Sequence, residues 1–202
     1  MKWIAPILVY VAVGVGLFFV RNALGALVLF HIASVISVLI TKSHIPIKIL
    51  VTSYDIKWIL ISVFLCGSSG ITLYFLWDKF GIAADLAQRV KEMGLTHATW
   101  FWFIAYFTLA NPWIEEYFWR GFLGSTTENF YISDFLYAGF HGLILMNKVQ
   151  ASMIVYSLAL LVLAGWFWRQ IARADQGLLA SVLGHMAADF SILMAVYLKS
   201  RG

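Results

Sequence analysis

The chain has 202 residues, of which 62% are hydrophobic and only 12% are charged, and its mean hydropathy is +0.85. Soluble domains carry roughly 25% charged and about 45–50% apolar residues, so this composition excludes an ordinary soluble domain and indicates an integral membrane protein. The formal net charge of +4 is spread along the chain without a basic run. It suits a surface of anionic lipid head groups and gives no sign of nucleic-acid binding.

Residues 1–22 begin with a positive charge and continue with an apolar core, as a signal peptide does. No small-x-small cleavage site precedes Arg21, and a second apolar stretch follows directly. We therefore expect this segment to be retained as a first membrane helix.

Several apolar runs approach the roughly 20 residues that a helix needs to cross the ~30 Å hydrocarbon core. They predict an all-α, polytopic transmembrane helix bundle with about seven spans, six or eight being open alternatives. The Lys and Arg residues divide almost evenly between the two sides of this topology, so the orientation is not predicted. The runs cover residues 4–20, 23–40, 58–77, 97–110, 133–147, 151–168 and 177–198.

Two longer polar connections interrupt these runs. Residues 41–57 are expected to form a basic loop or an interfacial helix. Residues 78–96 place Ile82, Leu86, Val90 and Met93 at spacings of three or four, which predicts an amphipathic helix on the membrane surface. We expect residues 1–202 to form a single membrane domain.

Polar side chains within the apolar runs are the candidates for function, because they are costly inside a bilayer. Asn111 and Pro112 predict that a helix starts or kinks there, so that Glu115 and Glu116 fall near the positive end of a helix dipole. Glu116 precedes Arg120 by four residues, the favourable order for an ion pair on one helix. Glu115 points about 100° away from Glu116 and is left available as a general base.

Further candidates lie in the last helices. His185 and Asp189 are four residues apart and share a helix face, and so do Tyr137 and His141. Three helices thus offer a carboxylate, an imidazole, and an imidazole with a carboxylate. His31 is a lone intramembrane histidine, for which a hydrogen bond between helices is the expected role.

Three motifs together resemble those of the CAAX-protease and bacteriocin-processing family of intramembrane glutamic proteases, the type II CAAX endopeptidases. They are EEYFWRG at 115–121, YAGFH at 137–141 and HMAAD at 185–189, beside the family patterns EExxxR, FxxxH and HxxxN/D. The resemblance covers roughly residues 105–195. It implies catalytic helices within 97–198, whereas 1–96 contributes less characteristic N-terminal helices.

The resemblance also implies the roles of the residues. Glu115 and His141 would activate a water molecule, while His185 and Asp189 would bind the oxyanion. Glu116 and Arg120 would hold the site in place, and Tyr137 stands where Phe is usual. Asp189 replaces the Asn of many members, and because an ionised carboxylate only accepts hydrogen bonds, we expect it to orient His185 or, if protonated, to donate directly.

The expected function is therefore hydrolysis of a peptide bond in a membrane-anchored protein or peptide, without metal or other cofactor. A zinc enzyme that uses Glu115, His141 and His185 as ligands is one alternative, although the chain lacks HExxH. A non-catalytic transporter or immunity protein is the other. The short chain is typical of a multi-pass protein of a prokaryotic cell membrane.

Overall fold

The computed structural model describes residues 2–42 and 45–200, and this part of the chain is helical without any strand. The predicted all-α bundle is thereby confirmed. Three short 3₁₀ segments, Lys2–Ile4, Ile47–Val51 and Trp77–Lys79, lie in the connections. The helices are α1 (Ala5–Gly14, continued by the π-helix η2, Val15–Val20), α2 (Ala23–Ile40), α3 (Ile56–Phe75), α4 (Leu86–Glu92), α5 (His97–Glu116, continued by the π-helix η5, Tyr117–Phe122), α6 (Ile132–Leu145), α7 (Ala151–Asp175) and α8 (Leu179–Ser200).

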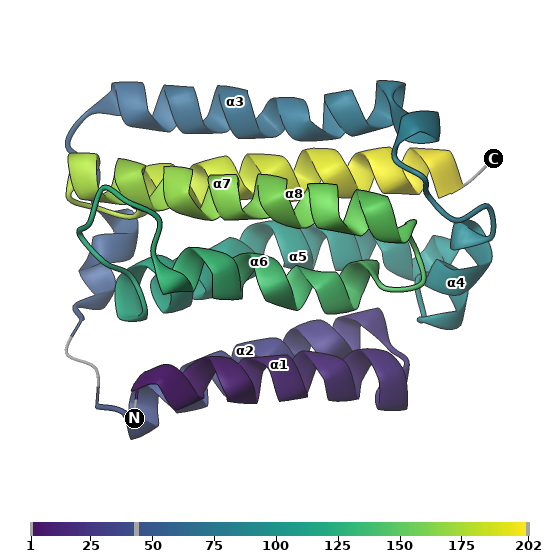
Figure 1. Ribbon diagram of the computed structural model, residues 1–202, viewed down its shortest axis with the longest axis horizontal. Helices are drawn as coiled ribbons and strands as arrows, with labels where there is room; N and C mark the ends of the chain where they lie inside the picture. Colours follow the sequence, from purple (N-terminus) through teal and green to yellow (C-terminus); the bar gives the residue numbers. More distant parts are fainter. Residues whose placement is uncertain (1, 43–44, 201–202) are drawn as a thin grey trace.

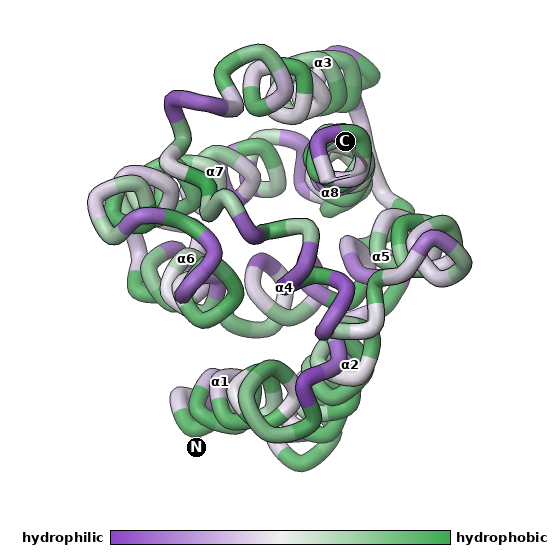
Figure 2. Tube along the Cα trace, turned by 90° about the vertical axis from the view of Figure 1, so that its right-hand side faces the viewer, coloured by the Kyte–Doolittle hydropathy of each residue, from purple (hydrophilic) through white to green (hydrophobic). Residues whose placement is uncertain are grey.

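The long helices lie side by side in successive layers. In Figure 1, α3 covers α8 and α7 at the top, α5 and α6 form the middle, and the hairpin of α1 and α2 lies at the bottom. Figure 2, seen along the bundle, shows the same order, with α8 and α5 on one side and α7 and α6 on the other. The middle of the bundle is thus enclosed by helices from both halves of the chain.

Five helical segments are long and apolar enough to cross a membrane, namely Lys2–Val20, Ala23–Ile40, Ile56–Phe75, Ala151–Asp175 and Leu179–Ser200. α6 is a shorter apolar helix of 14 residues. α5 has 20 residues but carries Asn111, Glu115 and Glu116 in its last turns. With α5 and α6 lying along the other five, the expected seven spans agree roughly with the structure.

Local sequence explains where several helices begin. The Asn22 side chain caps α2 by accepting a hydrogen bond from the Gly25 backbone N–H at 2.8 Å. Asp55 caps α3, and Thr96 with Thr99 forms a capping box at α5. Such side chains satisfy the backbone N–H groups that a helix start leaves without partners.

The amphipathic helix expected within 78–96 is present as the shorter α4. Leu86 and Val90 are its buried residues and pack near Trp100. The Ala23 backbone N–H donates to the Met93 carbonyl at 2.9 Å, which ties the end of this segment to the start of α2. Figure 1 shows α4 at one end of the bundle, beyond the long helices.

α3 and α8 approach closely because glycines line their contact. A Cβ added at Gly70 would collide with the Ser191 backbone, and one at Gly184 would collide with the Ser62 side chain. Small residues allow such backbone contact between membrane helices, whose association is driven by van der Waals packing because the hydrophobic effect is absent in lipid. α8, which carries two of the candidate site residues, is therefore held firmly against α3.

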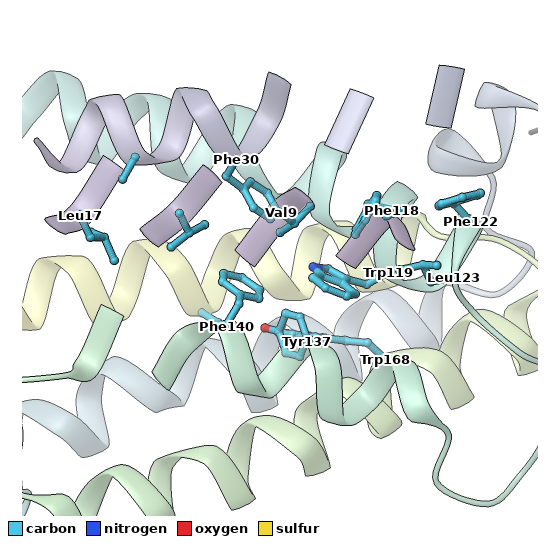
Figure 3. Close-up of a cluster of buried hydrophobic side chains, with 14 of the residues drawn as sticks. Val9, Leu17, Phe30, Phe118, Trp119, Phe122, Leu123, Tyr137, Phe140 and Trp168 are labelled. Carbon is cyan, nitrogen blue, oxygen red and sulfur yellow. The ribbon is translucent and has the colours of Figure 1, made fainter. Parts of the chain in front are cut away.

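The core lies where α1, α2, η5, α6 and α7 meet. Its aromatic members include Trp119, stacked on Phe140 with ring centroids 5.7 Å apart, and Tyr137, which meets Trp119 edge-on at 6.2 Å. Figure 3 shows Trp119, Tyr137, Phe140 and Trp168 gathered in this cluster. Rigid rings thus surround the helical segment that carries the motif at 115–121.

Of the two alternatives predicted at Asn111 and Pro112, a helix start or a kink, the helix start is wrong. α5 runs through Pro112, and Glu115 and Glu116 lie in its last turn, directly before η5. Proline is tolerated inside membrane helices because neighbouring groups satisfy the backbone that it frees. The positive end of a helix dipole therefore does not account for the buried glutamates, and their side-chain partners must do so.

Candidate active site

Glu116 joins three parts of the bundle through one carboxylate oxygen. It is fully buried, and its Oε1 lies 3.1 Å from Arg120 Nη1 and 2.8 Å from His185 Nδ1. Because a carboxylate oxygen accepts, Nδ1 of His185 donates this hydrogen bond. The predicted ion pair of Glu116 and Arg120 is present, and it extends to α8.

The Arg120 guanidinium is buried between aromatic rings. Its central carbon lies 4.0 Å from the centre of the Tyr137 ring and 5.0 Å from that of Trp168. Its contact with Glu116 is an ion pair without the alignment of a hydrogen bond. Cation–π contact with two rings thus contributes to holding this charge inside the bundle.

His185 is held by an aromatic ring on one face and by Glu116 at its Nδ1 edge. Its ring stacks on Trp168 with centroids 4.6 Å apart and an interplanar angle of 18°. Nε2 lies 3.5 Å from Oδ1 of Asp189, beyond the usual range of a hydrogen bond. Glu116 therefore makes the shorter contact that orients His185, and the Nε2 edge faces Asp189 across a gap.

His141 has a defined tautomer. Its Nδ1 lies 2.9 Å from the Tyr137 carbonyl oxygen, which can only accept, so Nδ1 carries the proton. In the neutral ring, Nε2 then holds the lone pair. The Tyr137 ring lies between the two histidines, with its centroid 4.9 Å from that of His141 and 6.2 Å from that of His185.

Glu115 has surroundings different from those of Glu116. Its Oε1 accepts a hydrogen bond of 2.8 Å from Nδ2 of Asn111, while Oε2 is buried without a hydrogen-bond partner in the described part of the chain. No ion pair with Arg120 is formed by Glu115 among the described residues. The side chain is 2% exposed, so it is an unpaired carboxyl group inside the bundle.

The seven predicted site residues thus lie in α5, η5, α6 and α8 around one interior region. Glu116, Arg120, His185 and Asp189 form a connected series of contacts, and Tyr137 joins His141 to them through ring contacts. A direct contact between Glu115 and His141 is not among the contacts of the described residues. The Asp189 side chain is 13% exposed and His141 is half-buried, so the region is least covered beside these two.

Two residues contact the site but were not predicted from the sequence to be site residues. Trp168 supplies the stacking surface for His185, and it could not be found without knowing how α7 packs. Asn111 was interpreted as a helix start, although it stands four residues before Glu115, a spacing that places both on one helix face. His31 makes the hydrogen bonds between helices that were expected of it, to Tyr106 and Asn111.

The described residues contain no group of three or more His, Cys, Asp or Glu arranged to hold a metal ion. Glu115, His141 and His185 therefore do not form the ligand set of the zinc alternative in this conformation. The Nδ1 atoms of both histidines are already engaged by oxygen acceptors within the protein.

Comparison with known proteins supports the motif-based interpretation. No curated protein and no solved structure matches the chain. A family model does match residues 97–191, that of the Rce1-like type II CAAX prenyl endopeptidases. The matched segment spans α5 to most of α8 and includes all seven predicted site residues. The proteins of this family are proteases that act on membrane-associated proteins in the bilayer. The resemblance to the type II CAAX endopeptidases is thus confirmed over residues 97–191.

Proposed function

We propose that the protein is an intramembrane glutamic endopeptidase in which Glu115 activates water. The observation that carries this proposal is the contrast between two adjacent buried glutamates. Glu116 pairs with Arg120 and His185 through Oε1, whereas Glu115 accepts from the neutral amide of Asn111 and forms no ion pair among the described residues. The Oε2 atom of each glutamate is buried without a hydrogen-bond partner in the described structure. A buried carboxylate that no cation neutralises is suited to general-base catalysis.

The proposed reaction needs one water molecule and no metal. Glu115 takes a proton from the water as the water oxygen bonds to the carbonyl carbon of the peptide. Nε2 of His141, the lone-pair nitrogen, accepts a hydrogen bond from the other water hydrogen. Glu115 then passes its proton to the amide nitrogen as the C–N bond breaks, which regenerates the carboxylate.

The negative charge on the carbonyl oxygen is assigned to the Nε2 edge of His185. Because Nδ1 of His185 donates to Glu116, a second proton on Nε2 makes the ring a cationic donor held in place by an anion. Asp189 lies on this edge, 3.5 Å away, and assists as the partner of that proton. Preorganised donors of this kind stabilise developing charge without rearrangement.

Glu116, Arg120 and Tyr137 are assigned supporting roles. The ion pair of Glu116 and Arg120 orients His185, and Tyr137 separates the two imidazoles while covering the guanidinium. We propose a membrane-anchored protein or peptide as substrate, and a prokaryotic cell membrane as the site of action. The substrate class is proposed from the resemblance to the type II CAAX endopeptidases.

The substitution Glu115→Gln tests this function. It keeps the side-chain shape but removes the base, so we expect hydrolysis to fall by about 10²- to 10⁴-fold. The measurement is mass spectrometry of labelled peptide N-termini in membranes that contain equal amounts of each variant. Peptides that appear with the wild type and vanish with Glu115→Gln identify the products and the substrate.

Glu128→Gln is the matched control, because this side chain is 79% exposed in a loop away from the site. It should leave the peptide pattern unchanged. An identical peptide pattern for wild type and Glu115→Gln, with both proteins folded, would contradict the proposed function and favour a non-catalytic membrane protein.

A further inference from the structure

Asn111 contacts both carboxyl groups of the candidate site that lack an ion pair with arginine. It lies in α5 one turn before Glu115 and is fully buried. Its Nδ2 donates to Glu115 Oε1 at 2.8 Å and also faces Asp189 Oδ2 at 3.4 Å. One NH₂ group with two hydrogens thus bridges an acid on α5 and an acid on α8.

The orientation of this amide follows from its surroundings. With Nδ2 toward Glu115 and Asp189, donors meet acceptors on both contacts. In the flipped orientation, Oδ1 would face two carboxyl oxygens and leave acceptors opposed inside the bundle. The buried polar groups therefore favour a single orientation of Asn111.

His31 on α2 fixes the other end of the amide. Its Nε2 lies 3.1 Å from Oδ1 of Asn111, and since that oxygen can only accept, Nε2 carries the proton. Nδ1 of the neutral ring then accepts from the Tyr106 hydroxyl at 2.9 Å. Tyr106, His31 and Asn111 form a series of hydrogen bonds that runs from an exposed tyrosine through two buried side chains to the two acids.

We propose that Asn111 is a positioning residue that holds Glu115 and Asp189 side by side, and that His31 keeps its amide in the donating orientation. This inference rests on the proposed function, because it assigns the geometry of the same site. It brings α2, which lies outside the segment matched by the family model, into the support of the catalytic groups. The partners that orient catalytic groups must hold them closely, and their loss typically lowers activity about 10- to 100-fold.

Exchanging the amide and the acid tests the proposal. Asn111→Asp removes the shared donor and places three carboxyl groups in contact, so we expect hydrolysis to fall by about 10- to 100-fold. Adding Asp189→Asn restores an NH₂ group at the same contact, now supplied by α8 instead of α5. The double variant should regain roughly tenfold over Asn111→Asp, because a donor again lies between the two positions.

The rate is measured as the appearance of the Glu115-dependent peptides in substrate-containing membranes, with equal amounts of protein purified in detergent. Asn129→Asp is the matched control, since Asn129 is exposed in the loop before α6, and it should leave the rate unchanged. A residue that only fills space would not be rescued by a second change across the contact. A double variant no faster than Asn111→Asp overturns the inference.

A second set of variants serves if Asn111→Asp does not fold. Asn111→Ala and His31→Ala should each lower the turnover number with little change in melting temperature. The variant with both changes should be no slower than Asn111→Ala, because His31 acts through Asn111. Losses that multiply overturn the proposed connection between the two residues.

The outcomes separate this inference from the proposed function. If Glu115→Gln abolishes the products while Asn111→Asp and Asn111→Ala keep the wild-type rate, the function stands and the role of Asn111 is wrong. If Glu115→Gln leaves the products unchanged, both are wrong.

Discussion

Glu115 and Glu116 are adjacent in the chain but meet different partners, because neighbouring helix positions point about 100° apart. Glu116 faces α8 and η5 and offsets the cost of burial with two cationic or hydrogen-bonding partners. Glu115 faces Asn111, a neutral donor, and forms no ion pair among the described residues. Two adjacent positions of the chain thus hold a proposed base and a structural acid.

The substitution Asp189→Asn shows whether a charge at this position is needed. The distance of 3.5 Å from Nε2 of His185 is too long for a strong orienting contact, and Glu116 already orients the ring. An Asn oxygen can still accept from Asn111, and its NH₂ group can donate to an oxyanion. We therefore expect the activity of this variant to stay within roughly tenfold of wild type, since hydrogen-bond donors still face the oxyanion.

The measurement is again the rate at which Glu115-dependent peptides appear. A loss as large as that of Glu115→Gln, in a protein with unchanged melting temperature, would show that the ionised carboxylate is required. That result would assign Asp189 the orienting role expected from the sequence.

Spacing within one helix predicted local contacts well. The pairs of Glu116 with Arg120 and of His185 with Asp189 both face one another, as residues four apart on one helix should. The partners in contacts between helices were not predicted, because spacing says nothing about which faces meet. The bond from Glu116 to His185 and the stacking of Trp168 on His185 are of this second kind.

Several helix boundaries followed the apolar runs closely, whereas α5 and α7 extend beyond the ends predicted at 110 and 168. α2 has the predicted bounds of 23–40, and α3, α6 and α8 differ from the predicted runs by one or two residues at each end. Pro112 lies inside α5, and the regular α-helix instead gives way to the π-helix η5 after Glu116. π-Helical turns are frequent at functional sites, and no pattern in this sequence indicated one.

The glycine contact between α3 and α8 gives a prediction with an internal control. A methyl group at Gly70 would collide with the Ser191 backbone, so Gly70→Ala should destabilise the protein by about 1–3 kcal/mol. At Gly67, in the same helix, the added carbon would meet only Ala187 Cβ at 3.5 Å, an ordinary contact. Gly67→Ala should therefore be neutral or stabilising by up to about 1 kcal/mol, from helix propensity.

Thermal unfolding of both variants in the same detergent measures the difference. Gly70→Ala should melt at a lower temperature than wild type, and Gly67→Ala at the same or a higher one. Equal melting temperatures for the two variants would mean that α3 and α8 are not in backbone contact at Gly70.

Across the whole molecule, the chain passes from one end of the bundle to the other along each long helix. The start of α2 lies with the segment after α4, and Gly81 lies with Gln150 at the start of α7, through backbone hydrogen bonds of 2.9 Å. At the opposite end, Leu178 before α8 donates to Ile49 before α3, also at 2.9 Å. The bundle therefore has two distinct ends, which correspond to the two membrane surfaces.

Cysteine labelling tests whether α5 crosses the membrane as this path requires. Cys66 is the single cysteine and is buried, so it can be replaced by Ala before new cysteines are introduced. We expect a membrane-impermeant maleimide to label Lys57→Cys and Glu128→Cys from one side and Asp85→Cys from the other. These side chains are 59%, 79% and 56% exposed and form surface ion pairs, which contribute little to stability.

The informative comparison is between Asp85→Cys and Glu128→Cys. Labelling of these two from the same side would mean that α5 turns back within the bilayer. Labelling from opposite sides supports the seven-span interpretation and also determines the orientation, which the even distribution of Lys and Arg does not reveal.

The hydrogen bond from His31 to Asn111 has a consequence for biosynthesis. α2 supplies His31 and is made early, whereas α8 supplies His185 and Asp189 and leaves the ribosome after every other helix described here. Folding during synthesis proceeds from the N-terminus onward, so a nascent chain would contain the proposed base before it contains the groups proposed to bind the oxyanion. In the proposed mechanism, hydrolytic activity arises only when the last helix docks against α3 and α5, and we expect a chain truncated before α8 to be inactive.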